Sequence, residues 1–144
     1  MIMKTEQQLP LVSFEQAKRL KELGFDWECE QFYNGEKLTD YKTAGFDEEC
    51  PLKNNYNDSG FDWNDGVEKE WFSAPTVALA LKWFKKIKNI VCDVVYSECE
   101  ERVGIFYCYR IYEIDKISRL YSNYELAESV LLDELLTLIE TNKI

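Results

Sequence analysis

The stretch Ser73-Ala-Pro-Thr-Val-Ala-Leu-Ala-Leu-Lys-Trp-Phe-Lys-Lys-Ile-Lys88 decides how this chain is interpreted, because it predicts a central helix over residues 73–88. Ser73 is a typical N-cap, since its hydroxyl can accept a hydrogen bond from an amide of the first turn. Pro75 falls in that turn, where a missing amide hydrogen does no harm. Apolar residues recur at helical spacing as far as Ile87, so we expect a helix buried over most of its circumference.

Four lysines gather on the remaining surface of this helix, towards its C-terminal end. They are Lys82, Lys85, Lys86 and Lys88. Cations near a helix C-terminus complement the helix dipole. The helix dipole therefore explains the basic cluster. A dedicated anion-binding site is the alternative interpretation.

The segments before the central helix predict a helix, a hairpin and a long loop. A capping box at Ser13-Phe14-Glu15-Gln16, with Gly24 as a left-handed C-terminal cap, predicts a helix over residues 12–24. Asn34-Gly35 suits the centre of a two-residue type I′ turn, which predicts a hairpin over residues 28–41. Residues 42–72 show no periodicity and are predicted to form a long acidic loop that carries aromatic residues.

The segments after the central helix predict a sheet and a covering helix. Alternating and β-branched residues predict a three-strand antiparallel meander over residues 90–121, with Asp115-Lys116 turning the chain into the third strand. A wide apolar face predicts a helix over residues 123–141, capped by Ser122 or by Asn123. The fold class expected is α+β: two layers, with two or three helices packed on one face of a mainly antiparallel sheet.

Length and composition indicate one globular domain over residues 1–144, with 46% hydrophobic and 15% aromatic residues. No run approaches the ~20 apolar residues that span a bilayer, and the first residues lack a signal-peptide pattern, so we expect a cytoplasmic protein without membrane contact. The five cysteines include no Cys-x-x-Cys pair and the chain has no histidine. We therefore expect free, mostly buried thiols and no cofactor.

Charge is concentrated in one segment. The chain has a formal net charge of −10, and residues 24–70 alone hold 13 acidic and four basic residues, a net −9. Such a field repels phosphates and attracts basic proteins. The sequence thus predicts no direct nucleic-acid binding and favours a basic protein as partner. It does not indicate whether the chain is a monomer or an oligomer.

Three segments together resemble a group of small uncharacterised proteins of gut Bacteroidetes and their phages or mobile elements. They are Leu11–Lys18, Ser73–Phe84 and Tyr124–Leu136, and the likeness extends over most of the chain. No activity or catalytic residue is assigned in that group, so the resemblance implies only a bacterial setting. Proteins in such a setting often act by binding another protein.

Several kinds of chemistry are excluded or kept as alternatives. Triad hydrolysis and the common nucleotide cradles are excluded, because histidine, Gly-x-Ser-x-Gly and the glycine-rich phosphate loops are all missing. A small carboxylate-dependent enzyme, or a glycan- or ion-binding protein, stays open as the alternative function. Asp58, Asp62 and Asp65 are only weak candidates for cation ligands. An EF-hand loop aligned on this segment would place Phe61 and Trp63 at ligand positions one and three, where oxygen ligands are needed.

The leading hypothesis is a non-enzymatic adaptor or inhibitor that uses the acidic aromatic segment to bind a basic protein. Tryptophan and charge complementarity are both typical of protein-binding surfaces. The candidate binding residues are Trp27, Asp47, Glu48, Phe61, Asp62, Trp63, Asp65 and Trp71. The alternative is that the three tryptophans among them only fasten this segment to the domain.

Overall fold

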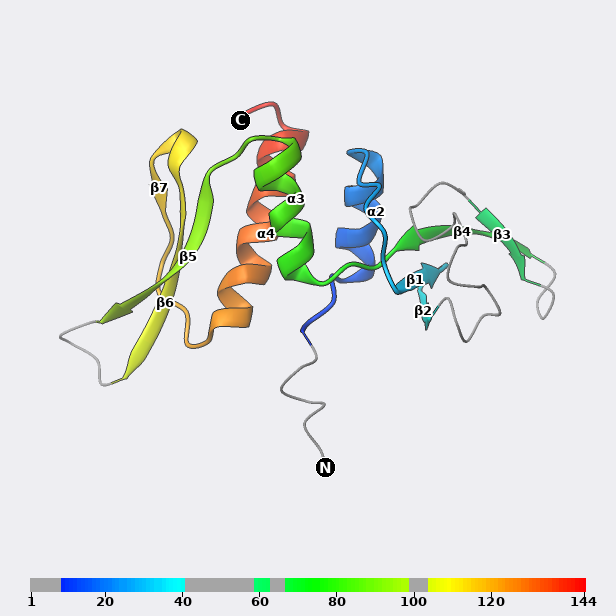
Figure 1. Cartoon of the computed structure of the whole chain (residues 1–144), viewed down its shortest axis with the longest axis horizontal. Helices are drawn as coiled ribbons and strands as arrows, with labels where there is room; N and C mark the ends of the chain where they lie inside the picture. Colours follow the sequence, from blue (N-terminus) through cyan, green and yellow to red (C-terminus); the bar gives the residue numbers. More distant parts are fainter. Residues whose placement is uncertain (1–8, 41–58, 63–66, 99–103) are drawn as a thin grey trace. The chain divides into compact units, whose positions relative to one another are not determined.

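The computed structural model describes residues 9–40, 59–62, 67–98 and 104–144 (Figure 1). The described chain forms two compact units, one of residues 11–76 and one of residues 77–144 with Pro10. Each unit combines helix with antiparallel sheet, which confirms the α+β class. The strands are divided between two sheets, however, where the sequence predicted a single one.

The first helix of unit 11–76 follows the predicted caps closely. Helix α2 (Phe14–Glu22) begins with a full capping box, in which the Gln16 amide donates to Ser13 Oγ and the Ser13 amide donates to Gln16 Oε1. At its end Gly24 has φ +95°, and the Phe25 amide donates to the Leu20 carbonyl at 3.0 Å. This is the Schellman arrangement, which satisfies carbonyls that the helix leaves unpaired.

The predicted hairpin is present, but its turn is shifted by one residue. Strands β1 (Gln31–Asn34) and β2 (Lys37–Asp40) pair with Asn34 opposite Lys37, so the two loop residues are Gly35 and Glu36. Only Gly35 in this turn has a positive φ, at +60°. That pattern fits a type II′ turn, whose first central residue is glycine, and the predicted type I′ turn at Asn34-Gly35 is wrong.

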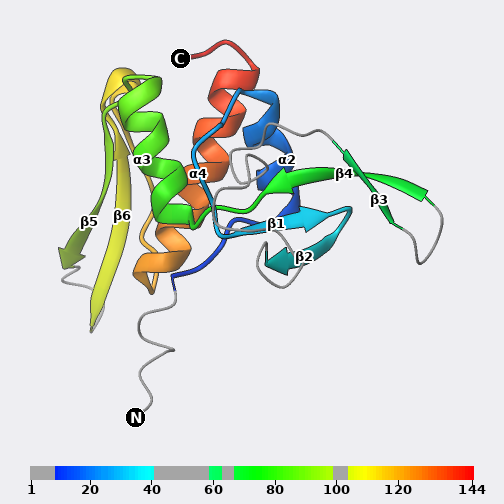
Figure 2. The same ribbon diagram turned by 45° about the vertical axis from the view of Figure 1, so that its right-hand side comes forward.

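The prediction of an irregular loop over residues 42–72 is also wrong, because two strands occupy part of it. Strands β3 (Ser59–Asp62) and β4 (Val67–Ser73) pair with each other and complete a sheet of order β2-β1-β4-β3 (Figure 2). Strand β4 lies beside β1, which is more than 30 residues earlier in the sequence. Local periodicity carries no information about such a distant partner.

The central helix starts later than predicted. Ser73 is the last residue of β4 and pairs with Phe32 of β1, so it is not the N-cap. Pro75 also precedes the helix, and α3 runs over Val77–Ile87. Ser73 is buried in the sheet, which gives its backbone a strand partner that competes with helix formation.

The two ends of unit 11–76 lie together. Leu11 and Thr76 form an antiparallel bridge, and the Val12 amide donates to the Pro75 carbonyl at 3.0 Å. Nearby, the Tyr33 hydroxyl donates to the Val12 carbonyl at 2.7 Å. These bonds fix where the chain enters and leaves the unit.

Helix α2 packs on the sheet through aromatic contacts. The Phe14 ring meets Tyr33 of β1 and Phe72 of β4 edge-on, with centroids 5.7 and 5.6 Å apart. Lys21 Nζ donates to the Trp71 carbonyl at 2.6 Å. The helix is thereby tied to both strands that run through the middle of this sheet.

Unit 77–144 contains the predicted meander. Strands β5 (Cys92–Glu98), β6 (Ile105–Ile111) and β7 (Lys116–Ile117) form an antiparallel sheet in that order. A 3₁₀ turn (Tyr112–Ile114) and a left-handed Asp115, with φ +50°, reverse the chain into β7. The third strand is shorter than predicted, although Tyr121 still bridges to Tyr107.

Helix α4 (Tyr124–Glu140) covers this sheet and lies beside α3 (Figure 1). Asn123 is its N-cap, accepting from the Leu126 amide at 2.7 Å, so the second of the two predicted caps is the correct one. Its core residues are leucines with almost no exposed surface: Leu131, Leu132, Leu135 and Leu136. In α3, Trp83 is buried and Ile87 is exposed. The prediction that Ile87 belongs to the buried apolar surface of this helix is therefore wrong. None of the described helices has the length and apolar character needed to cross a membrane.

Candidate functional site

A row of exposed carboxylates follows helix α2 in unit 11–76. In residues 25–30 burial alternates: Phe25 and Cys29 are buried and Trp27 is half-buried, whereas the three acidic residues between and after them are exposed. We call Asp26, Glu28 and Glu30 the acidic ridge. The segment is drawn as an extended connection between α2 and β1 (Figure 1), and alternation is the period of an extended chain.

Two of the predicted tryptophans belong to the body of this unit. Trp27 packs against Phe25 with ring centroids 6.4 Å apart, and Trp71 packs against Phe32 at 5.1 Å. Both tryptophans are half-buried. Their contacts fit the interpretation that these rings fasten the acidic segment to the fold.

The other predicted site residues are placed only in part. Phe61 and Asp62 lie in β3, where they pair with Glu68 and Val67 of β4. The remaining candidates for partner or cation binding lie outside the described residues: Asp47, Glu48, Asp58, Trp63 and Asp65. The structure therefore brings forward the carboxylates at residues 26–30, which the predicted partner-binding set did not include although it included Trp27 among them.

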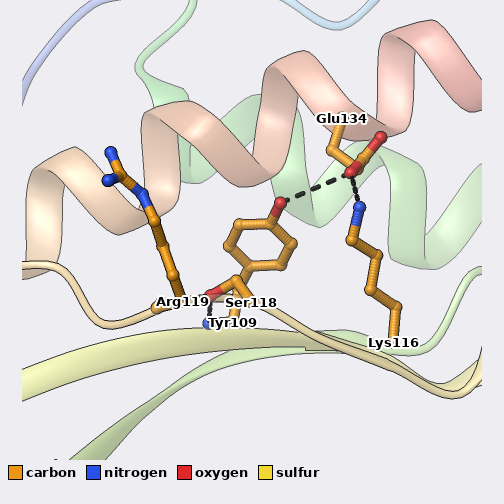
Figure 3. Close-up of polar contacts among 5 residues, drawn as sticks. All are labelled: Tyr109, Lys116, Ser118, Arg119 and Glu134. Carbon is orange, nitrogen blue, oxygen red and sulfur yellow. Dashed lines mark hydrogen bonds and ion pairs between the residues drawn. The ribbon is translucent and has the colours of Figure 1, made fainter.

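A polar cluster in unit 77–144 was not predicted from the sequence (Figure 3). Lys116 of β7 forms an ion pair with Glu134 of α4, and the Tyr109 hydroxyl donates to the same carboxylate at 3.5 Å. Ser118 Oγ accepts from the Tyr109 amide at 2.9 Å. The available signal was Glu134 itself, a charged residue that interrupts the leucine-rich face of the predicted helix.

This cluster is suited to holding α4 on the sheet. Burial, then the negative charge of Glu134, raises the pKa of Tyr109 to about 12. A phenol with that pKa stays protonated at neutral pH and acts as a hydrogen-bond donor, not as a base. Tyr109 has 4% of its surface exposed, so a substrate has little access to it.

Two buried cysteines of the described residues are equally unsuited to reaction. Burial raises the pKa of Cys29 to about 12 and that of Cys92 to about 11. Thiols are nucleophilic as thiolates, so these side chains are inert at neutral pH. Cys108 is also buried and free, while Cys50 and Cys99 lie outside the described residues. Within the described ranges no three His, Cys, Asp or Glu side chains come together in a way that could hold a metal ion.

Comparisons with protein-family models, with curated proteins and with solved structures found no match to this chain. The geometry and charge of the molecule itself are therefore the basis for inferring its function. The acidic ridge combines a regular spacing, exposure and a single sign of charge.

Proposed function

We propose that the chain is a non-enzymatic adaptor or inhibitor that binds a basic segment of another protein through the acidic ridge. The observation that carries the proposal is the alternation over residues 25–30, which exposes Asp26, Glu28 and Glu30 while Trp27 is half-buried and Cys29 is buried. The ridge lies within the segment that holds a net −9 of the total charge of −10. Such a field steers a cationic partner and speeds its association.

The spacing of the ridge defines the partner more closely. Carboxylates on every second residue of an extended chain recur at roughly 6.5 Å, because the rise per residue is about 3.3 Å. An extended segment with lysine or arginine on every second residue has the same period. The resemblance to proteins of gut Bacteroidetes and their phages suggests a bacterial protein as the source of that segment.

Binding of alternating and blocked lysine peptides tests both charge and spacing. The probes are acetylated peptides of the same composition, one with lysine and threonine alternating and one with the lysines in a single block. We expect the alternating peptide to bind more tightly, with an affinity that falls as salt rises, because the contacts are exposed ion pairs. Isothermal titration at several salt concentrations measures this.

A matched pair of triple variants separates the ridge from net charge. Neutralising the ridge by Asp26→Asn, Glu28→Gln and Glu30→Gln should weaken binding by roughly tenfold, at a few tenths to 1 kcal/mol per exposed pair. The control neutralises three exposed acids of the other unit: Asp115→Asn, Asp133→Asn and Glu140→Gln. Equal losses in the two triple variants, or equal affinity for both peptides, would overturn the proposal.

A further inference from the structure

The three-strand sheet of unit 77–144 has two faces, and α3 and α4 both lie on the same side of it (Figure 1). Cys92 and Ile111 are Cα partners on the helix side, and both are buried. Side chains alternate along a strand, so Asp93 and Arg110 next to them lie on the opposite face. We call this opposite face the outer face.

The outer face is apolar where a solvated face is normally polar. An antiparallel sheet covered on one side usually alternates apolar residues inside with polar residues outside. Here Val91, Tyr112 and Ile117 are 58%, 49% and 64% exposed. The Tyr112 amide donates to the Val91 carbonyl at 2.9 Å, and Ile117 is the Cα partner of Arg110. We call Val91, Asp93, Arg110, Tyr112 and Ile117 the outer patch. Large apolar side chains gathered at the surface are typical of an interaction site.

The outer patch contains one negative and one positive side chain, which are Cα partners across β5 and β6. The Tyr112 hydroxyl donates to Asp93 Oδ2 at 3.3 Å, whereas Asp93 Oδ1 accepts no hydrogen bond. The Arg110 side chain is exposed, and in the described structure no ion pair joins it to Asp93. A two-fold axis through such a patch brings each charge to the opposite charge of the other copy. The patch is therefore self-complementary, as a two-fold interface requires.

The charges around the outer patch determine how salt should act on such a contact. Glu113 and Asp115 are exposed at the turn that follows β6. The nearby cations Lys116 and Arg119 both point towards α4, away from the outer face (Figure 3). The border of the patch is therefore acidic, like the chain as a whole, which has a formal net charge of −10. Two copies repel each other through these charges, and salt reduces the repulsion.

We propose that the outer patch binds the same patch of a second copy of the chain, so that the two sheets pack face to face. Aligned packing of two sheets is a common way to bury apolar sheet faces. In this contact Arg110 of each copy reaches the Asp93 carboxylate of the other. The face measures roughly 10 Å by 20 Å, well short of the ~800 Å² per partner of a standard interface, so the dimer is weak. The contact does not involve the acidic ridge, and the proposal is independent of the proposed function.

Sedimentation equilibrium of the full chain at concentrations up to about 1 mM tests the proposal, because a small interface dissociates on dilution. We expect a monomer–dimer equilibrium whose association constant rises at least threefold between about 50 mM and 500 mM sodium chloride, as the repulsion is screened. Binding of a basic peptide to the acidic ridge has the opposite salt dependence. A monomer mass at every concentration in both salts would refute the proposal.

Lysine substitutions locate the contact. Ile117→Lys and Val91→Lys should each reduce the association constant at least tenfold, because a buried cation without a partner is costly. The matched control is Ile105→Lys, which makes the same change of charge at a residue that is 56% exposed but lies on the helix side of β6. An equal reduction with Ile105→Lys, or none with Ile117→Lys, would show that the outer patch is not the interface.

The charge pair is tested at Arg110, which is exposed and can be changed without disturbing the core. Arg110→Glu should abolish the dimer, whereas Arg110→Lys should retain most of the association because the positive charge remains. Arg119→Glu is the control, since it makes the same change of net charge at an exposed residue on the helix side. Equal losses with Arg110→Glu and Arg119→Glu would overturn the pairing of Arg110 with Asp93 of the second copy.

Discussion

The two compact units are built from similar elements, but they differ in how far apart in the sequence their partners lie. In unit 77–144 each strand pairs with the next one along the chain, and α4 follows directly to cover them. In unit 11–76 strand β1 pairs both with the adjacent β2 and with the distant β4. The first kind of pairing can be inferred from local pattern, whereas the second depends on contacts that only the folded chain makes.

Core truncation in each unit is the largest expected effect and tests whether the units are distinct. Phe32→Ala in β1 should cost about 3–5 kcal/mol and Leu132→Ala in α4 about 2–5 kcal/mol, because each leaves a cavity. Amide exchange should accelerate first in residues 11–76 for the former and in residues 77–144 for the latter. Leu126→Ala, at an exposed position, is the control and should change stability by less than 0.5 kcal/mol. Uniform acceleration over both units would contradict the division.

Alkaline pH should destabilise both units through their buried thiols. Cys29 and Cys92 ionise from an ordinary pKa of 9.0 in the unfolded chain but near 12 and 11 in the fold. The contribution of each thiol to the free energy of unfolding is therefore fully present below pH 9. It is lost as the pH rises from 9 to the pKa of that thiol in the fold, because the unfolded thiol releases its proton first. The loss at pH 11 should be about 3 kcal/mol for Cys29, because pH 11 is two units above the pKa in the unfolded chain and each unit corresponds to about 1.4 kcal/mol.

Urea denaturation of the wild type and Cys29→Ala between pH 7 and pH 11 measures this. The variant should lose stability at neutral pH through the missing side chain, but its stability should then fall less steeply with pH. Cys92→Ala should flatten the pH profile less than Cys29→Ala, because its pKa is raised less. Parallel profiles for all three proteins would show that the thiols do not carry the effect.

Removing a helix cap should have a smaller effect on stability, and one of similar size in the two units. Ser13→Ala removes one partner of the capping box of α2, and Asn123→Ala removes the side chain that accepts the Leu126 amide of α4. Each should cost about 1 kcal/mol in thermal or urea unfolding. Ser122→Ala is the matched control for α4, because it changes the neighbouring residue that does not cap. A larger loss with Ser122→Ala than with Asn123→Ala would reverse the assignment of the cap.

The last comparison concerns the hairpin turn of unit 11–76, where the expected effect is similar in size to that of the caps. Gly35→Ala should cost about 1–2 kcal/mol, because a side chain at φ +60° is strained. Asn34→Ala should cost less, since Asn34 lies in the strand and has no positive φ. Comparable losses in the two variants would support the turn centred one residue earlier.

The sequence predicted the capping box of α2, the α+β class and the meander, because each depends on residues that are close together in the chain. Ser13 and Gln16 are three residues apart, and the leucines of α4 repeat within a turn or two. The start of α3 could not be predicted this way. Ser73 and Pro75 satisfy the rules for a helix start, yet the pairing of Ser73 with Phe32 places them before it.

The candidate site was predicted less completely than the fold. The acidic character of residues 24–70 was evident from composition, but composition does not show which carboxylates are exposed. Burial of Phe25 and Cys29 determines that, and these two residues lie between the end of α2 at Glu22 and the start of β1 at Gln31.

The bridge between Leu11 and Thr76 has a consequence for protein engineering. The chain enters and leaves residues 11–76 at one place, so this unit has the topology of a domain inserted into another chain. The flanking residues are also bonded to each other, because the Val77 amide donates to the Pro10 carbonyl at 2.9 Å. A short linker could join Leu11 to Thr76 and move the termini to a new cut, as in a circular permutation. Replacing the unit by a tight turn between Pro10 and Val77 would likewise preserve the local connection, so the two segments could be recombined as interchangeable modules.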